Sequence, residues 1–123
     1  MAPPPVVYVV DDDPSVRRAL ARMIRVAGLE VETRETAGEF LAQDHSRRPA
    51  CLVLDVHLPG MSGPDLQDRL AATDPDLPIV VVTAHGEEDV RRRMLQAGAV
   101  AFLSKPCDGD VLLEAIRRGL ERS

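Results

Sequence analysis

Short runs of apolar, mostly β-branched residues alternate along this chain with stretches of helical periodicity, and this alternation limits the fold more than any other feature. The strand-like runs are 6–10, 29–33, 51–54, 79–82 and 99–103, and the helical stretches that follow them are 14–27, 36–44, 64–72, 87–97 and 108–120. Strict alternation of strands and helices indicates a parallel sheet joined by right-handed crossovers. We therefore predict a doubly wound α/β fold with five parallel strands and helices on both faces.

The residues that end these strands predict the strand order. Reactive side chains follow four of the strands: Asp11 and Asp12 the first, Asp55 the third, Thr83 the fourth, and Ser104 and Lys105 the fifth. The second ends in the ordinary turn Thr33 to Glu35. Ligands of doubly wound sheets bind beyond the carboxyl ends of the strands, where the strand order reverses. The order 2-1-3-4-5 makes the four reactive strands neighbours, and we predict that order.

The clustered carboxylates predict a metal site. Two carboxylates about 5 Å apart repel by roughly 3 kcal/mol at an effective dielectric constant of 20, and Lys105 alone would not neutralise three. Mg²⁺ would, because it prefers oxygen ligands and accepts phosphate oxygens as well. Asp55 precedes a loop rich in proline and glycine that leaves its carboxylate open. Such a carboxylate can attack a phosphoryl group, with Lys105 and Thr83 stabilising the transferred charge.

Four motifs carry a resemblance to a known family. They are V-D-D at Asp11 and Asp12, D-x-x-L-P-G-M-S-G from Asp55 to Gly63, V-T-A-H-G from Val82 to Gly86, and F-L-S-K-P from Phe102 to Pro106. Over essentially its whole length the sequence resembles the receiver domain of two-component response regulators, in particular receivers of the FixJ type found ahead of LuxR-type DNA-binding domains. The resemblance implies a flavodoxin-like (βα)5 fold. Receivers also have the strand order 2-1-3-4-5, so the order that we predict from the strand ends is not independent of this resemblance.

The resemblance also implies a role for each site residue. Asp55 would accept a phosphoryl group from a sensor histidine kinase. Mg²⁺ would be held by Asp11, Asp12, Asp55 and the backbone carbonyl of His57. Lys105 would pair with the phosphoryl group, while Thr83 and Phe102 would move as the domain switches. Our own hypothesis adds that His57 and His85, which flank the expected site, tune the lifetime of the phosphoryl group by steering or excluding water.

We expect the domain to be a switch and no enzyme beyond its own phosphotransfer and slow autodephosphorylation. Residues 1–5 are predicted to be a lead and residues 6–121 the receiver. The family implies control of transcription through a C-terminal DNA-binding domain absent from this chain, with a phosphorylation-dependent homodimer formed through helix 87–97 and strand 99–103. The alternative is a stand-alone receiver in a phosphorelay.

Composition argues against other partners and locations. The net charge of −5 and the three aromatic residues disfavour direct nucleic-acid binding. The apolar runs are too short to span a membrane, and we expect a cytoplasmic protein. Cys51 and Cys107 lack the spacing of a metal site and are expected to be free thiols. In helix 108–120 we expect Val111 to point inward with Leu112, Ala115 and Ile116.

Two other functions remain open at this point. A Mg²⁺-dependent phosphohydrolase of the haloacid dehalogenase type would use Asp11 as nucleophile within the D-x-D pattern of Asp11 to Asp13, but it would leave Asp55 without a role. A flavodoxin-like nucleotide or flavin binder would need a phosphate-binding loop rich in glycine or in serine and threonine after the first strand. The sequence has none there.

Overall fold

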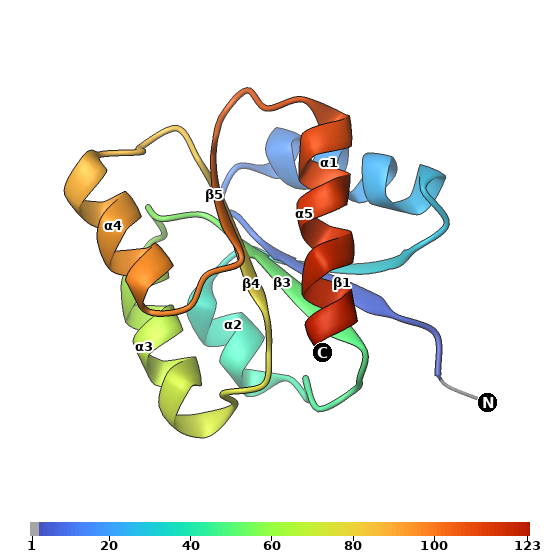
Figure 1. The fold of residues 1–123 in the computed structure, drawn as a ribbon, viewed down its shortest axis with the longest axis horizontal. Coiled ribbons are helices and arrows are strands. Elements are labelled where there is room, and N and C mark those ends of the chain that lie inside the picture. The colour runs from blue at the N-terminus through green and yellow to red at the C-terminus, as the bar shows by residue number, and fades with distance from the viewer. Residues whose placement is uncertain (1–2) are drawn as a thin grey trace.

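A computed structural model describes residues 3–123. Five parallel strands, in the order 2-1-3-4-5, form one twisted sheet (Figure 1). The strands are β1 (Val6–Val10), β2 (Glu30–Arg34), β3 (Ala50–Leu54), β4 (Ile79–Thr83) and β5 (Ala101–Ser104), and the helices are α1 (Pro14–Val26), α2 (Ala37–Ala42), α3 (Gly63–Thr73), α4 (Glu88–Gln96) and α5 (Gly109–Arg122). The predicted fold class and strand order are confirmed.

Two layers of helices cover the sheet. Helices α1 and α5 lie on one face, and α2, α3 and α4 lie on the other (Figure 1). Every residue of β1, β3 and β4 is buried, whereas the edge strands β2 and β5 are partly exposed. Continuous apolar strands are what a parallel sheet covered on both faces requires. The sheet therefore has a rigid centre, and the carboxyl ends of β1, β3 and β4 are held by it.

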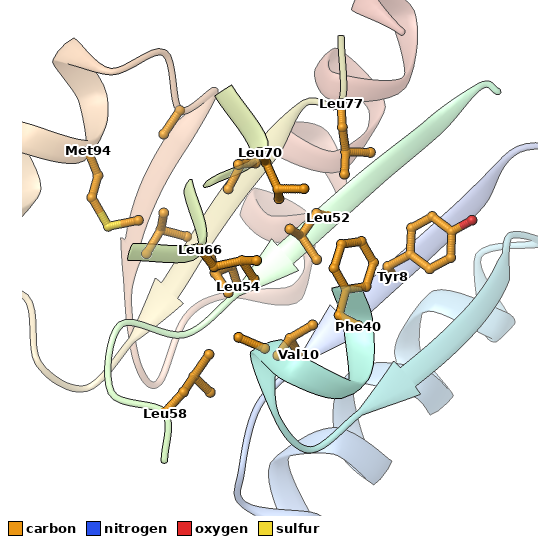
Figure 2. Packing of buried hydrophobic residues seen from close by; sticks show 14 of the residues in the cluster. Tyr8, Val10, Phe40, Leu52, Leu54, Leu58, Leu66, Leu70, Leu77 and Met94 are labelled. Atoms are coloured by element: carbon orange, nitrogen blue, oxygen red, sulfur yellow. The ribbon is translucent and has the colours of Figure 1, made fainter. Parts of the chain in front are cut away.

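Alternate residues of the strands serve two separate cores. Leu52 and Leu54 face α2 and α3, together with Phe40 and Leu66 (Figure 2). Cys51 and Val53 face α1 and α5. This split follows from the two-residue period of a strand.

Helix α4 is the least firmly attached of the helices. Met94 is its one buried residue, and its N-cap, Glu87, makes no side-chain capping bond. By contrast, α1 starts at Pro14 behind an Asp13 cap, and α2 starts with a Thr36–Glu39 capping box. Little apolar burial and an open N-terminus make α4 the easiest helix to displace.

The structure corrects one prediction about the core and shifts several boundaries. Val111 is 49% exposed instead of buried. It belongs to the first turn of α5, and its side chain projects about 100° around the helix axis from that of buried Leu112. The last strand begins at Ala101, two residues later than predicted.

The division into a lead of 1–5 and a receiver of 6–121 stays a prediction, and residues 1–2 of that lead lie outside the described part of the chain. Within residues 3–123, no helix is both long enough and apolar enough to cross a membrane.

Candidate functional site

The carboxyl ends of four strands bring the predicted residues into one crevice. Asp11 follows β1, Asp55 follows β3, Thr83 ends β4 and Lys105 follows β5. Lys105, the single lysine of the chain, places its Nζ 2.6 Å from Asp11 Oδ2 and 3.0 Å from Asp55 Oδ2. Asp11, Asp55 and Thr83 are all buried. The lysine thus bridges two buried carboxylates that come from different strands.

Three carboxylates converge at this crevice. One oxygen each of Asp11, Asp12 and Asp55 lies within 4.8 Å of the others, and Asp12 is the exposed member. The oxygens of Asp11 are both engaged, Oδ1 by the Asp13 backbone N–H at 2.9 Å and Oδ2 by Lys105. Oδ1 of Asp55 is buried without any hydrogen-bond partner among the described residues. A buried oxygen without a partner, beside two more carboxylates, suits a hard cation or a phosphoryl group.

The pKa values of the bridge reflect its burial and its pairing. Burial raises the pKa of Asp11 above its usual value, against the lowering effect of the hydrogen bonds from Lys105 and the Asp13 N–H. Burial opposes the charge of Lys105 as well, but its hydrogen bonds to Asp11 and Asp55 outweigh that effect and raise its pKa. Lys105 is therefore a cation at neutral pH.

A close backbone contact holds the loop after Asp55. The Gly63 N–H donates to the Val56 carbonyl at 2.8 Å. A Cβ at position 63 would lie 2.3 Å from the Asp55 carbonyl oxygen and 2.9 Å from Val56 Cα. Glycine is therefore required where α3 begins. In the sequence, Gly63 marks only a loop, and no local pattern shows that it lies against the Asp55 backbone.

Thr83 and Phe102 meet the loop between β4 and α4. The Thr83 hydroxyl oxygen accepts the backbone N–H of His85 at 3.1 Å, which leaves the hydroxyl proton available to another acceptor. Phe102 is half-buried, and its ring edge is 3.4 Å from where a Cβ at Gly86 would be. The aromatic ring of β5 therefore packs against the loop that Thr83 begins.

The two histidines lie against each other. The ring centroids of His57 and His85 are 4.0 Å apart, with an angle of 36° between the ring planes. Both residues are exposed. His57 belongs to the loop after β3 and His85 to the loop after β4, so the pair joins two loops that border the crevice.

Asp13 does not join the acid group. Its side chain caps α1 by accepting the Ser15 N–H at 2.9 Å and the Ser15 hydroxyl at 2.7 Å. Asp13 therefore places a negative charge at the N-terminus of this helix, where the helix dipole favours it. The D-x-D pattern therefore fails to bring its second acid to the crevice, which argues against the phosphohydrolase alternative.

A 2-1-3-4-5 sheet with an acidic crevice at its carboxyl edge and a lysine directly after the last strand defines a class of α/β signalling domain. The family model described as response regulator receiver domain matches residues 7–117. The chain belongs to this family and is a receiver domain of the two-component response regulators.

Relatives and solved structures agree with this assignment. The chain is 44% identical to Nodulation protein W of Bradyrhizobium diazoefficiens, over 95% of the chain and 52% of that protein. It is 37% identical to the transcriptional regulatory protein FixJ of Rhizobium meliloti, over 94% of the chain and 56% of that protein. The crystal structure of FixJ-N superposes with a TM-score of 0.87 at 36% identity, covering 98% of this chain and 96% of that one. The chain spans about half the length of these two curated relatives.

Proposed function

We propose that Asp55 is the phosphoacceptor and that a sensor histidine kinase is the donor. The observation that carries the proposal is the buried, unpartnered Oδ1 of Asp55, on a carboxylate whose other oxygen is held by Lys105. An oxygen of Asp55 would bond to phosphorus as the bond between phosphorus and the donor imidazole nitrogen breaks, and a proton from solvent would neutralise that nitrogen. Apart from this transfer, slow hydrolysis of the aspartyl phosphate is the only chemistry proposed for the domain.

The proposal includes Mg²⁺ as cofactor. The carboxylates of Asp11, Asp12 and Asp55 fit such an ion, because they meet within 4.8 Å and offer the oxygen ligands that Mg²⁺ prefers. The backbone carbonyl of His57 would complete the protein ligands. When bound, Mg²⁺ supplies positive charge that offsets the phosphoryl oxygens. Lys105 would then pair with the phosphoryl group.

Phosphorylation replaces the single negative charge of the Asp55 carboxylate by up to two on the phosphoryl group, and this would favour a different position of the loop after Thr83. The free hydroxyl proton of Thr83 gives it a donor for a phosphoryl oxygen. Phe102 would turn inward as this loop moves away from it. The packing of Phe102 against Gly86 supports a coupling between the two, and the weak attachment of α4 supports a shift of that helix.

The contact between His57 and His85 supports their proposed role in the lifetime of the phosphoryl group, because two rings in contact beside the crevice would limit the approach of water. The expected result for the His57→Ala, His85→Ala double variant is faster loss of the phosphoryl group. His45→Ala is the matched control, since His45 is paired with Asp74, away from the crevice. An unchanged rate in the double variant would contradict the role.

The output is proposed from the relatives. FixJ is named a transcriptional regulatory protein, so we propose a cytoplasmic regulator that controls transcription through a further, DNA-binding domain. Phosphorylation would promote a homodimer through the face formed by 87–97 and 99–103. Size-exclusion chromatography with and without beryllofluoride tests the dimer: a persistent monomer would favour the stand-alone receiver instead.

Intact-mass analysis after incubation with acetyl phosphate tests the proposal. The wild type should gain one phosphoryl group with Mg²⁺ and none with excess EDTA, and Asp55→Asn should gain none under either condition. Label that persists in Asp55→Asn but disappears in Asp11→Asn would instead support the phosphohydrolase chemistry.

A further inference from the structure

Arg17 is the arginine of α1 whose side chain returns to the acidic crevice. Its Nη1 donates to the backbone carbonyl of Asp11 at 2.6 Å, in a partly buried position. The other three arginines of α1, Arg18, Arg22 and Arg25, make no side-chain hydrogen bond or ion pair within residues 3–123. The contact at Arg17 therefore distinguishes it from a general basic face of the helix.

The Asp11 carbonyl needs the Arg17 donor because it lies beyond the last hydrogen bond between β1 and β3. The register of β1 with β3 ends at Val10 opposite Leu54, and the last bond on that side runs from the Asp55 N–H to the Val10 carbonyl. On the other side, the Asp11 N–H still donates to Arg34. Asp11 is only 2% exposed, and buried backbone carbonyls are almost always paired. The Arg17 guanidinium therefore supplies the hydrogen bond that a neighbouring strand would otherwise donate to this carbonyl.

The turn that Arg17 closes is the one that carries the acids. Between the end of β1 and the start of α1 are only Asp11, Asp12 and Asp13. The Asp13 N–H fixes the Asp11 carboxylate from one side and Lys105 fixes it from the other. Arg17 adds a third restraint, on the carbonyl of the same residue, and it spans the turn from the first turn of the helix.

We propose that Arg17 is a positioning residue for cation binding: it holds the turn between β1 and α1 in the conformation in which the carboxylates of Asp11 and Asp12 converge with that of Asp55. This inference rests on the proposed Mg²⁺ site. Arg17 touches a backbone oxygen of a proposed ligand, so it acts through Asp11.

Removal of Arg17 should change the Mg²⁺ affinity in one direction if the residue acts through its charge and in the other if it acts by positioning Asp11. This difference makes the proposal testable. Removing a positive charge beside a cation site strengthens cation binding by electrostatics alone. Losing a residue that orients a ligand weakens binding, typically by 10- to 100-fold. The direction of the change in Mg²⁺ affinity therefore separates the two roles.

The experiment is isothermal titration of the whole chain with MgCl₂ at low ionic strength, at a temperature where circular dichroism shows each variant folded. Arg17→Met should bind Mg²⁺ about tenfold more weakly than the wild type, and Arg17→Lys, which keeps a donor and the charge, should lose less. Arg22→Met is the matched control: it removes an exposed arginine of the same helix and should not weaken binding. Unchanged or tighter binding by Arg17→Met overturns the proposal.

A phosphorylation assay and a second variant test the same role of Arg17. With acetyl phosphate, Arg17→Met should need about tenfold more Mg²⁺ for half-maximal phosphorylation, while its rate at saturating Mg²⁺ stays near that of the wild type. If Arg17→Met does not fold, Arg17→Ala, which also removes the donor to the Asp11 carbonyl, decides, and wild-type affinity in that variant overturns the proposal. A wild type that binds no Mg²⁺ overturns the proposed metal site itself, whereas a wild type that binds Mg²⁺ with the same affinity as Arg17→Met overturns only the role of Arg17.

Discussion

Replacing Lys105 by methionine should destabilise the protein strongly in the absence of Mg²⁺. The side chains of Lys105, Asp11 and Asp55 are only 18%, 3% and 7% exposed, so the variant leaves two buried carboxylates without their counter-charge. Carboxylate oxygens within 4.8 Å repel by about 3.5 kcal/mol at an effective dielectric constant of 20. Breaking a buried ion pair by removing one partner costs about 3–5 kcal/mol.

In Lys105→Met, protonation of one of the two carboxylates limits the loss in free energy of unfolding. From the ordinary aspartate pKa of 3.8, protonation at pH 7 costs about 4.4 kcal/mol, and at pH 5 it costs about 1.6 kcal/mol. We therefore expect Lys105→Met to lose about 3 kcal/mol at pH 7 and about 1.5 kcal/mol at pH 5. Because pairing raises the pKa of Lys105, its contribution in the wild type is fully present below its usual pKa of 10.5. The difference between the stability losses expected at pH 5 and at pH 7 therefore comes from protonation of the carboxylates.

Urea unfolding followed by circular dichroism at pH 5 and pH 7 measures these losses. Lys105→Arg keeps the charge and is the control, with an expected loss below about 1 kcal/mol. Saturating Mg²⁺ should narrow the gap between Lys105→Met and the wild type, because the carboxylates bind the cation more tightly without the lysine charge beside them, and a ligand stabilises the folded state more the more tightly it binds. A midpoint for Lys105→Met equal to that of the wild type, at pH 7 without Mg²⁺, would refute this reasoning.

Three further predictions concern residues outside the crevice. Gln67 donates from its buried Nε2 to the Met94 carbonyl at 2.9 Å, so Gln67→Met should cost about 1 kcal/mol and speed hydrogen exchange in α4; unchanged exchange would contradict the link. A Cβ on Gly119 would lie 2.8 Å from Cys51 Sγ, so Gly119→Ala should lower the urea midpoint by an overpacking cost of about 1–3 kcal/mol, and adding Cys51→Ala should restore it. Burial raises the pKa of Cys51 to about 12, so one thiol per chain, that of the half-buried Cys107, should react with Ellman's reagent in the native protein and two in urea; two fast thiols in the native protein would contradict the burial of Cys51.

The sheet could be predicted because its determinants are local. Each strand is a short apolar run, and the chemistry at the strand ends separated the four neighbouring strands from the edge strand. The members of the crevice, Asp11, Asp55, Thr83 and Lys105, could be named for the same reason, since topology alone brings the carboxyl ends of adjacent parallel strands together.

Contacts between distant segments could not be predicted in this way. His45 lies in a polar loop with no evident role in the sequence, yet its Nδ1 is 2.8 Å from Asp74 Oδ2 and its ring stacks on Phe40. Gln67 is buried because a carbonyl of α4 lies opposite it. The special position of Arg17 among the four arginines of α1 depends on where β1 leaves the sheet. In each case the partner is set by packing, which hydrophobic periodicity does not encode.

The central claim is that Asp55 accepts the phosphoryl group, and trapping the modified residue tests it most directly. Borohydride reduces an aspartyl phosphate to homoserine, which peptide sequencing by mass spectrometry locates. After incubation of the wild type with acetyl phosphate and Mg²⁺, homoserine should appear at position 55 and at neither position 11 nor position 12. Homoserine at position 11, or at no position in a protein that has gained a phosphoryl group, would contradict the account.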